Sequence, residues 1–136
     1  MGQLGMGVML GMLSGNEESV SAIRSSLNKT ISLVYLDDDS QLKFKFSDGT
    51  SLTIWDDGQC CCEARYMRTD DILTEFIGAT LLYFELKDAP STQDREWDDV
   101  HEIQFLDVKT DKGVFQIASH NEHNGYYGGF WIKAVN

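Results

Sequence analysis

Basic side chains are scarce in this sequence. The 136 residues include 11 Lys and Arg against 22 Asp and Glu, which gives a formal net charge of -11 at pH 7. Proteins bind long nucleic acids largely by neutralising phosphates with Lys and Arg, and the chain has no cluster of these residues. The composition therefore argues against a long nucleic acid or an anionic membrane surface as the partner.

Cysteines and long apolar runs are also few. The three cysteines are consecutive, at Cys60–Cys62, whereas secreted disulfide frameworks use an even number of separated cysteines. We expect free thiols in a reducing cytosol. The uncharged segment 1–15 is shorter than the roughly 20 apolar residues of a transmembrane helix, and it lacks the basic start of a secretory signal. We expect residues 1–15 to be a flexible apolar leader.

The composition otherwise suits an ordinary globular domain. There is a single proline, and apolar residues make up 42% of the chain, which is enough for a hydrophobic core at this length. No repeat or linker-like segment interrupts residues 16–136. We therefore expect these residues to form a single α+β domain.

Local patterns predict two short helices. Acidic residues followed by apolar residues at helical spacing predict a helix over residues 17–27. Thr69 is a favourable N-cap residue, and Gly78 suits the position after a helix end. A second short helix is therefore predicted between these two residues.

The rest of the chain alternates between apolar and polar residues, which is typical of strands. Asp48-Gly49 separates two alternating segments and predicts a hairpin. Residues 88–98 have no periodicity and are predicted to be the longest loop. The predicted fold is α+β, mainly antiparallel β-sheet with about seven strands. The strand segments are 30–36, 42–46, 52–55, 60–68, 80–87, 100–110, 114–119 and 130–132.

Residues 120–129 are the densest group of side chains suited to ligand binding. This segment holds two His, two Asn and two Tyr among glycines. Glycine lets a ligand approach the backbone closely, and the polar side chains offer hydrogen bonds. The alternative is a hairpin turn in which Asn and Gly adopt positive φ.

Two arginines, Arg65 and Arg68, follow the cysteines in this acidic chain. A guanidinium group can bind a phosphate without a basic surface around it. The alternative is a structural salt bridge to one of the many carboxylates. If the arginines meet the 120–129 segment, the pocket suits a small nucleotide. The predicted ligand-binding residues are Arg65, Arg68, Asn121, His123, Asn124, Tyr126 and Tyr127.

A zinc site is the alternative interpretation of the same region. Cys60 and Cys62 would share one face of a strand and could act with His120 and His123, and with His101 or Glu102. Small buried thiols are the simpler interpretation, and we predict no cofactor. We also predict no catalytic residues, although a cysteine nucleophile paired with one of these histidines is conceivable.

Four segments resemble a small bacteriophage and prophage protein family of unknown function. They are residues 56–66, 76–79, 99–105 and 120–129, and the resemblance covers roughly residues 28–135. It implies a virus-encoded intracellular accessory protein. In size and β-rich architecture the chain is also similar to anti-Thoeris sponges, which sequester cyclic ADP-ribose signals between subunits.

These observations predict a phage anti-defence protein in the host cytoplasm. We expect it to bind and sequester a small cyclic nucleotide or ADP-ribose-type immune signal without cleaving it. A homo-oligomer is expected because the leader and the aromatic loops have apolar surface to cover. The alternatives are an acidic nucleic-acid mimic that inhibits a host defence effector, and a zinc- or Cys-dependent enzyme.

Overall fold

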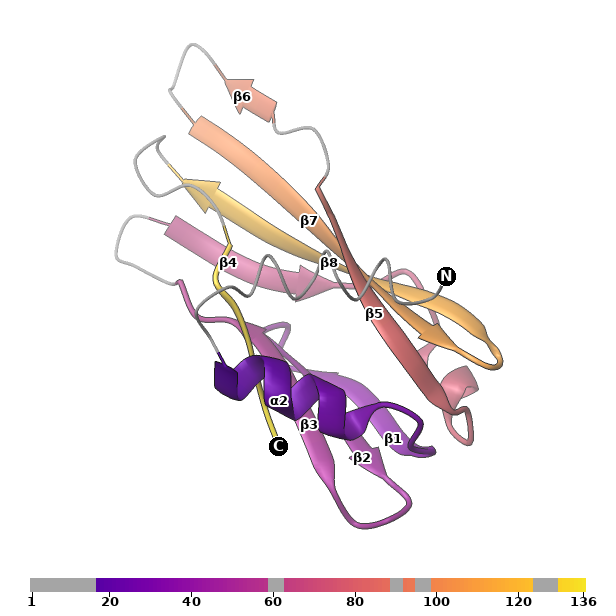
Figure 1. The fold of residues 1–136 in the computed structure, drawn as a ribbon. Helices are drawn as coiled ribbons and strands as arrows, with labels where there is room; N and C mark the ends of the chain where they lie inside the picture. Colours follow the sequence, from indigo (N-terminus) through magenta and orange to yellow (C-terminus); the bar gives the residue numbers. More distant parts are fainter. Residues whose placement is uncertain (1–16, 59–62, 89–91, 95–98, 124–129) are drawn as a thin grey trace.

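The computed structural model describes residues 17–58, 63–88, 92–94, 99–123 and 130–136 (Figure 1). The predicted leader, the three cysteines and residues 124–129 lie outside this part of the chain. The elements of the described residues are α2 (Glu17–Ser26), β1 (Ile31–Asp37), β2 (Gln41–Phe46), β3 (Ser51–Asp56), β4 (Glu63–Arg68), the 3-10 helix η1 (Leu73–Phe76), β5 (Leu81–Asp88), β6 (Thr92–Asp94), β7 (Asp99–Thr110), β8 (Gly113–His123) and β9 (Ile132–Val135).

The strands form two sheets. The first has the order β1-β2-β3-β9, and the second has the order β4-β8-β7-β5 with β6 beside β7. All the pairings are antiparallel. The prediction of a mainly antiparallel sheet is confirmed, with more strands than the seven or so expected. One of them, β6, lies within the predicted 88–98 loop, since a three-residue strand is too short to show a period.

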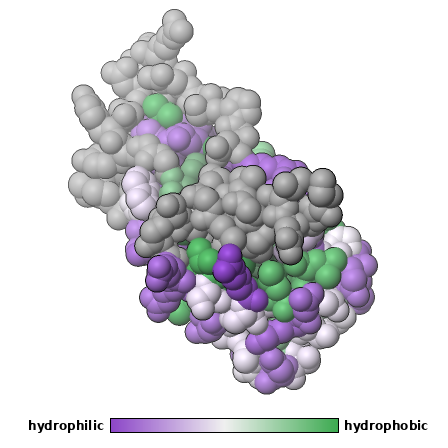
Figure 2. Space-filling view, in the orientation of Figure 1, coloured by the Kyte–Doolittle hydropathy of each residue, from purple (hydrophilic) through white to green (hydrophobic). Residues whose placement is uncertain are grey.

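Residue alternation explains the first sheet. Phe44 and Phe46 on β2 are buried, while Lys43 and Lys45 lie between them on the other face. Gly49 has φ +88°, as the predicted Asp48-Gly49 hairpin requires. The helix predicted at the N-terminal end is confirmed as α2, which buries Ile23. In Figure 2 the described surface around α2 is mainly hydrophilic, with apolar side chains next to it.

Backbone hydrogen bonds join the two sheets near β1 and β5. Ile31 N donates to Ala79 O at 2.8 Å, and Gly78 N donates to Ile31 O at 2.7 Å. Apolar side chains of both sheets form one core. Its largest fully buried members are Phe44, Phe84, Phe115, Ile23, Ile31, Leu42, Leu52, Ile54, Met67, Leu81 and Ile117.

The helix predicted between Thr69 and Gly78 is wrong, because only η1 is helical there. Thr69 Oγ1 donates to Gln116 O at 2.7 Å and accepts from Asp71 N at 3.1 Å. Asp71 Oδ2 accepts from Gln116 N at 2.8 Å. These bonds hold the segment against β8, so the turn begins only at Leu73. Gly78 has φ +90°, consistent with its predicted role at the end of a helical turn.

Strand β8 is longer than predicted. It continues to His123, because β4 pairs with it on one side and β7 on the other. His120–His123, predicted to be part of a binding loop, therefore belong to a central strand. Neither helix in the described residues is long and apolar enough to cross a membrane.

Candidate functional site

The second sheet presents two chemically different faces. Tyr66 on β4 and Ile103 on β7 both lie opposite His120 on β8. Side chains alternate along a strand, so residues one position away point to the other face. Arg65 and Asn121 therefore lie on the face that carries the hydrophobic core. We call this the inner face and the opposite one the outer face.

Arg65 is engaged on the inner face. Its side chain is only 3% exposed, and Nη1 lies 2.8 Å from Asp56 Oδ2. The Trp131 ring lies over the guanidinium, with 5.0 Å between Cζ and the ring centroid. The structure thus shows the salt bridge that was the alternative to phosphate binding at Arg65.

Two more predicted ligand-binding residues are buried on the inner face. Asn121 is 0% exposed, and His123 Nε2 lies 2.6 Å from Glu102 Oε1. Arg68 lies on the outer face, so the described members of the predicted set do not share one pocket. Alternation within β4 separates Arg65 from Arg68, whereas the position of Asn121 relative to them depends on the β4–β8 register. Asn124, Tyr126 and Tyr127 lie outside the described residues.

The same alternation separates the two histidines of the zinc alternative. His120 belongs to the outer face and His123 to the inner face. Cys60 and Cys62 lie outside the described residues. Within the described part of the chain, no group of three or more His, Cys, Asp or Glu residues is placed to hold a metal ion.

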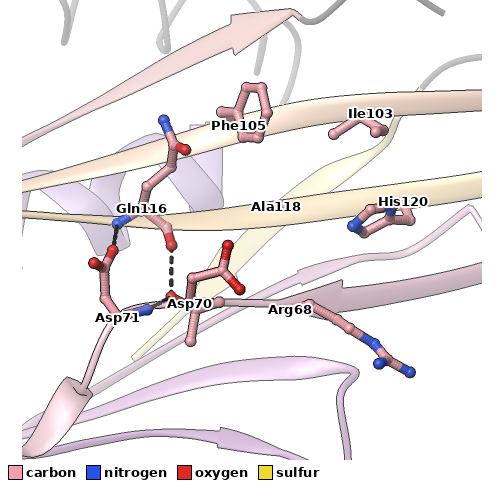
Figure 3. Close-up of a pocket in the computed structure, with 9 residues that line it drawn as sticks. Arg68, Asp70, Asp71, Ile103, Phe105, Gln116, Ala118 and His120 are labelled. Atoms are coloured by element: carbon pink, nitrogen blue, oxygen red, sulfur yellow. Dashed lines mark hydrogen bonds between the residues drawn. The ribbon is translucent and has the colours of Figure 1, made fainter.

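An open groove of about 470 Å³ lies on the outer face (Figure 3). Arg68 and His120 lie at one end, and Asp71 and Gln116 at the other. Apolar side chains of β7 and β8 form the floor between them. The lining residues are Arg68, Thr69, Asp70, Asp71, Ile103, Phe105, Gln116, Ala118 and His120.

Four side chains make a stacked row that extends from the Arg68 end of the groove. Arg68 Cζ lies 5.3 Å from the centroid of the Tyr66 ring. That ring stacks on His120 with centroids 4.7 Å apart and an interplanar angle of 8°. His120 Nδ1 lies 2.8 Å from His101 Nε2. We call Arg68, Tyr66, His120 and His101 the stacked row.

The surroundings of the stacked row shift the pKa values of two of its side chains. Burial, followed by the neighbouring His101, lowers the pKa of His120. Burial, followed by the Glu122 carboxylate, raises the pKa of the Tyr66 hydroxyl. Both side chains are therefore neutral at pH 7, and Arg68 is the only member that is always charged.

The acidic end of the groove is held in place by hydrogen bonds. Asp71 accepts from the Gln116 backbone, as described above. The Gln116 side chain donates to Asp107 Oδ1 at 2.7 Å, and Lys87 Nζ lies 2.9 Å from Asp107 Oδ2. Asp70 is exposed beside this anchored turn, and its carboxylate lines the groove.

A family model for a domain of unknown function, DUF7448, matches residues 24–131. The chain belongs to this family. The match includes both sheets apart from β9, and it covers the whole of the groove. The comparison with curated proteins found no match, and the comparison with solved structures found none either. The DUF7448 match confirms the part of the predicted resemblance that concerns a family of unknown function.

Sequence reasoning did not assign a ligand-binding role to several residues of the groove and of the stacked row in this DUF7448 domain. His101, Ile103 and Phe105 alternate along β7, and this period was present in the sequence. The alternation predicts a strand and shows that the three side chains share one face, but it does not identify the residues of neighbouring strands that lie beside that face. Tyr66 lies between Arg65 and Arg68 in the sequence, and only the β4–β8 register brings its ring against His120.

Proposed function

We propose that this DUF7448 domain binds a small nucleotide-type ligand in the outer-face groove and holds it without cleaving it. The observation that carries the proposal is the arrangement of the groove, which places a guanidinium at one end, an apolar floor in the middle and a carboxylate beside it. Its volume of about 470 Å³ is within the usual range of small-ligand sites. A nucleoside phosphate is complementary to this arrangement, because it carries an anionic phosphate, a flat base and polar groups at the edges of the base and the ribose.

Each part of the groove matches one part of such a ligand. Arg68 is exposed and can donate two parallel hydrogen bonds to a phosphate. Ile103 and Phe105 are half-buried and offer apolar contact to a planar base. The Asp70 carboxylate can accept hydrogen bonds from a base or a ribose hydroxyl.

The hydrogen bonds around the groove support binding over cleavage. Thr69 carries the only hydroxyl among the described lining residues, and that hydroxyl donates to Gln116 O. Asp71 accepts from the Gln116 backbone. A nucleophile needs a base within hydrogen-bonding reach to be activated, whereas in the described part of the chain Thr69 Oγ1 is hydrogen-bonded to the backbone of Gln116 and Asp71.

Binding without cleavage is what sequestration of a signal requires. The domain would then act as the sequence predicts, by lowering the concentration of a cyclic nucleotide or ADP-ribose-type immune signal in a phage-infected host. The acidic surface would repel most anions, so that only a ligand matching the groove is retained.

The first test compares two arginine variants that lose the same charge. Arg68→Gln removes the guanidinium from the groove, whereas Arg24→Gln removes an exposed guanidinium from α2. A charge-assisted hydrogen bond contributes about 1.5–3 kcal/mol, so Arg68→Gln should weaken binding about tenfold or more. Calorimetry with mononucleotides, cyclic nucleotides and ADP-ribose isomers, after a melting-temperature screen, measures the change. Arg24→Gln should bind like the unmodified protein.

The fate of the ligand separates the competing functions. Heating the complex should release the nucleotide intact, as detected by mass spectrometry. A converted ligand would instead indicate an enzyme. If no nucleotide raises the melting temperature, the proposal fails. Salt-sensitive capture of a host protein that is unchanged by Arg68→Gln would then favour the nucleic-acid mimic.

A further inference from the structure

The direct contact between two histidines suggests how the groove recognises an anion. His120 Nδ1 and His101 Nε2 are 2.8 Å apart, so one ring must donate its N–H to the lone pair of the other. Because Nδ1 of His120 is used in this contact, Nε2 is the ring nitrogen that remains for a ligand. His120 and Arg68 line the same end of the groove. An anion between them would contact a guanidinium and an imidazole.

The charges facing His120 come from three directions. Arg68 and Tyr66 face it from β4, and Glu122 lies on the outer face of β8. On β7, His101 faces it, while Glu102 points to the inner face and is paired with His123. Asp70 and Asp71 line the groove from the segment after β4, and Thr92 of β6 pairs with His101 through the backbone.

These neighbours keep His120 neutral only while the groove is empty of anions. Burial, the partner histidine and Arg68 all disfavour a second positive charge. A phosphate anion beside Arg68 would compensate the charge of the guanidinium and favour a positive charge on the imidazole. Protonation of His120 would then add a charge-assisted hydrogen bond to the anion.

We propose that the phosphate of the ligand binds between Arg68 and His120, and that the His101–His120 pair takes up one proton when it binds. This rests on the proposed function and specifies how the phosphate group of its ligand is held. His101 accepts a hydrogen bond from the imidazolium of His120, which keeps the added charge next to the ligand.

The sign of the pH dependence follows from this coupling. Because the bound state holds more protons than the empty state, affinity must rise as pH falls through the range in which His120 titrates. One proton gives at most about a tenfold change for each pH unit. We expect an anion to bind about threefold or more tightly at pH 6.5 than at pH 8.

Inorganic sulfate is the suitable probe, because it remains a dianion over this range. The chain has three histidines, so labelled imidazoles give few NMR signals to assign. The His120 and His101 signals should respond together to sulfate, and their titration midpoint should move to higher pH. His123 is paired with Glu102 on the inner face and serves as an internal control whose signal should not move with sulfate.

His120→Gln tests whether this imidazole takes up the proton. Glutamine can still hydrogen-bond to His101 and to an anion, but it cannot be protonated. We expect the ratio of sulfate affinities at pH 6.5 and pH 8 to fall towards one. An unchanged ratio in this variant, or a midpoint shift at His123 in place of His120, would contradict the proposal.

Adenosine monophosphate distinguishes failure of the coupling from failure of the proposed function. If it binds, and neither it nor sulfate binds more tightly at pH 6.5, the proton uptake is wrong and the groove is still a nucleotide site. If it binds but sulfate leaves His120 unaffected, the phosphate position is wrong. If no nucleotide of the panel binds, both proposals fail.

Discussion

Replacement of Asp56 by alanine is expected to lower the free energy of unfolding by about 3–5 kcal/mol, because it breaks a buried ion pair by removing one partner. Asp56 Oδ2 accepts from Arg65 Nη1 at 2.8 Å, and both side chains are almost fully buried. Oδ1 accepts from Gly58 N at 3.1 Å and from Trp131 N at 3.0 Å. One carboxylate thus joins the end of β3, strand β4 and the segment before β9.

Asp57→Ala is the matched control. Asp57 is the next residue and is also paired, with Lys133 Nζ at 2.8 Å from its Oδ2, but both side chains are nearly half exposed. Pairs of this kind contribute little to stability, so little change is expected. Chemical denaturation monitored by tryptophan fluorescence would compare the variants. Equal stability of the two variants would show that the Asp56–Arg65 pair is not desolvated as the structure indicates.

The second large effect is expected at the contact between the two sheets. Phe44 on β2 is 1% exposed, and its ring contacts Phe84 at 5.9 Å in an edge-on arrangement and Phe115 at 6.3 Å, centroid to centroid. Phe44→Ala would remove the side chain that joins β2 to β5 and β8. Such a substitution typically costs about 3–5 kcal/mol, because it leaves a cavity as well as losing apolar contact.

In urea denaturation, the midpoint of Phe44→Ala should lie at a much lower urea concentration than that of the unmodified protein. The dependence of the unfolding free energy on urea concentration should be unchanged. Val114→Ala is a suitable control, because Val114 lies on β8 and is 46% exposed. Surface substitutions generally change stability by less than about 0.5 kcal/mol. If Phe44→Ala were no more damaging than Val114→Ala, the two sheets would not share the core described above.

The effect of the groove substitutions on binding can be separated from these effects on folding. Arg68 is exposed on the outer face, whereas Arg65 is held by Asp56 on the inner face. We expect Arg68→Gln to change ligand affinity and leave the melting temperature nearly unaffected. Arg65 is unsuitable for that comparison, since any substitution there disturbs the buried ion pair.

Much of the fold could be predicted because the relevant signals are local. Alternation along Leu42, Phe44 and Phe46 predicted β2, and Asp48-Gly49 predicted the hairpin that follows. The predicted helix after Thr69 failed because distant atoms decided it. Gln116 uses the Thr69 hydroxyl and the Asp71 carboxylate that were expected to begin a helix.

The candidate site was less predictable, because it is assembled by register between strands. Arg65 and Arg68 are three positions apart and looked like one phosphate site, yet period-two alternation places them on opposite faces. His101 was considered only as a possible metal ligand and became important through its contact with His120, 19 residues away. No pattern within one strand specifies which residue of another strand lies opposite.

Residue content and spacing alone determined that this chain is acidic, mainly antiparallel β and poorly suited to long nucleic acids. They also marked residues 60–68 and 120–129 as the segments richest in side chains suited to ligand binding. Only the tertiary structure decided which of those side chains are buried in stabilising contacts and which face the groove. The physical reason is that local patterns act within a few residues, whereas burial, ion pairing and ring stacking depend on strands that meet only after folding.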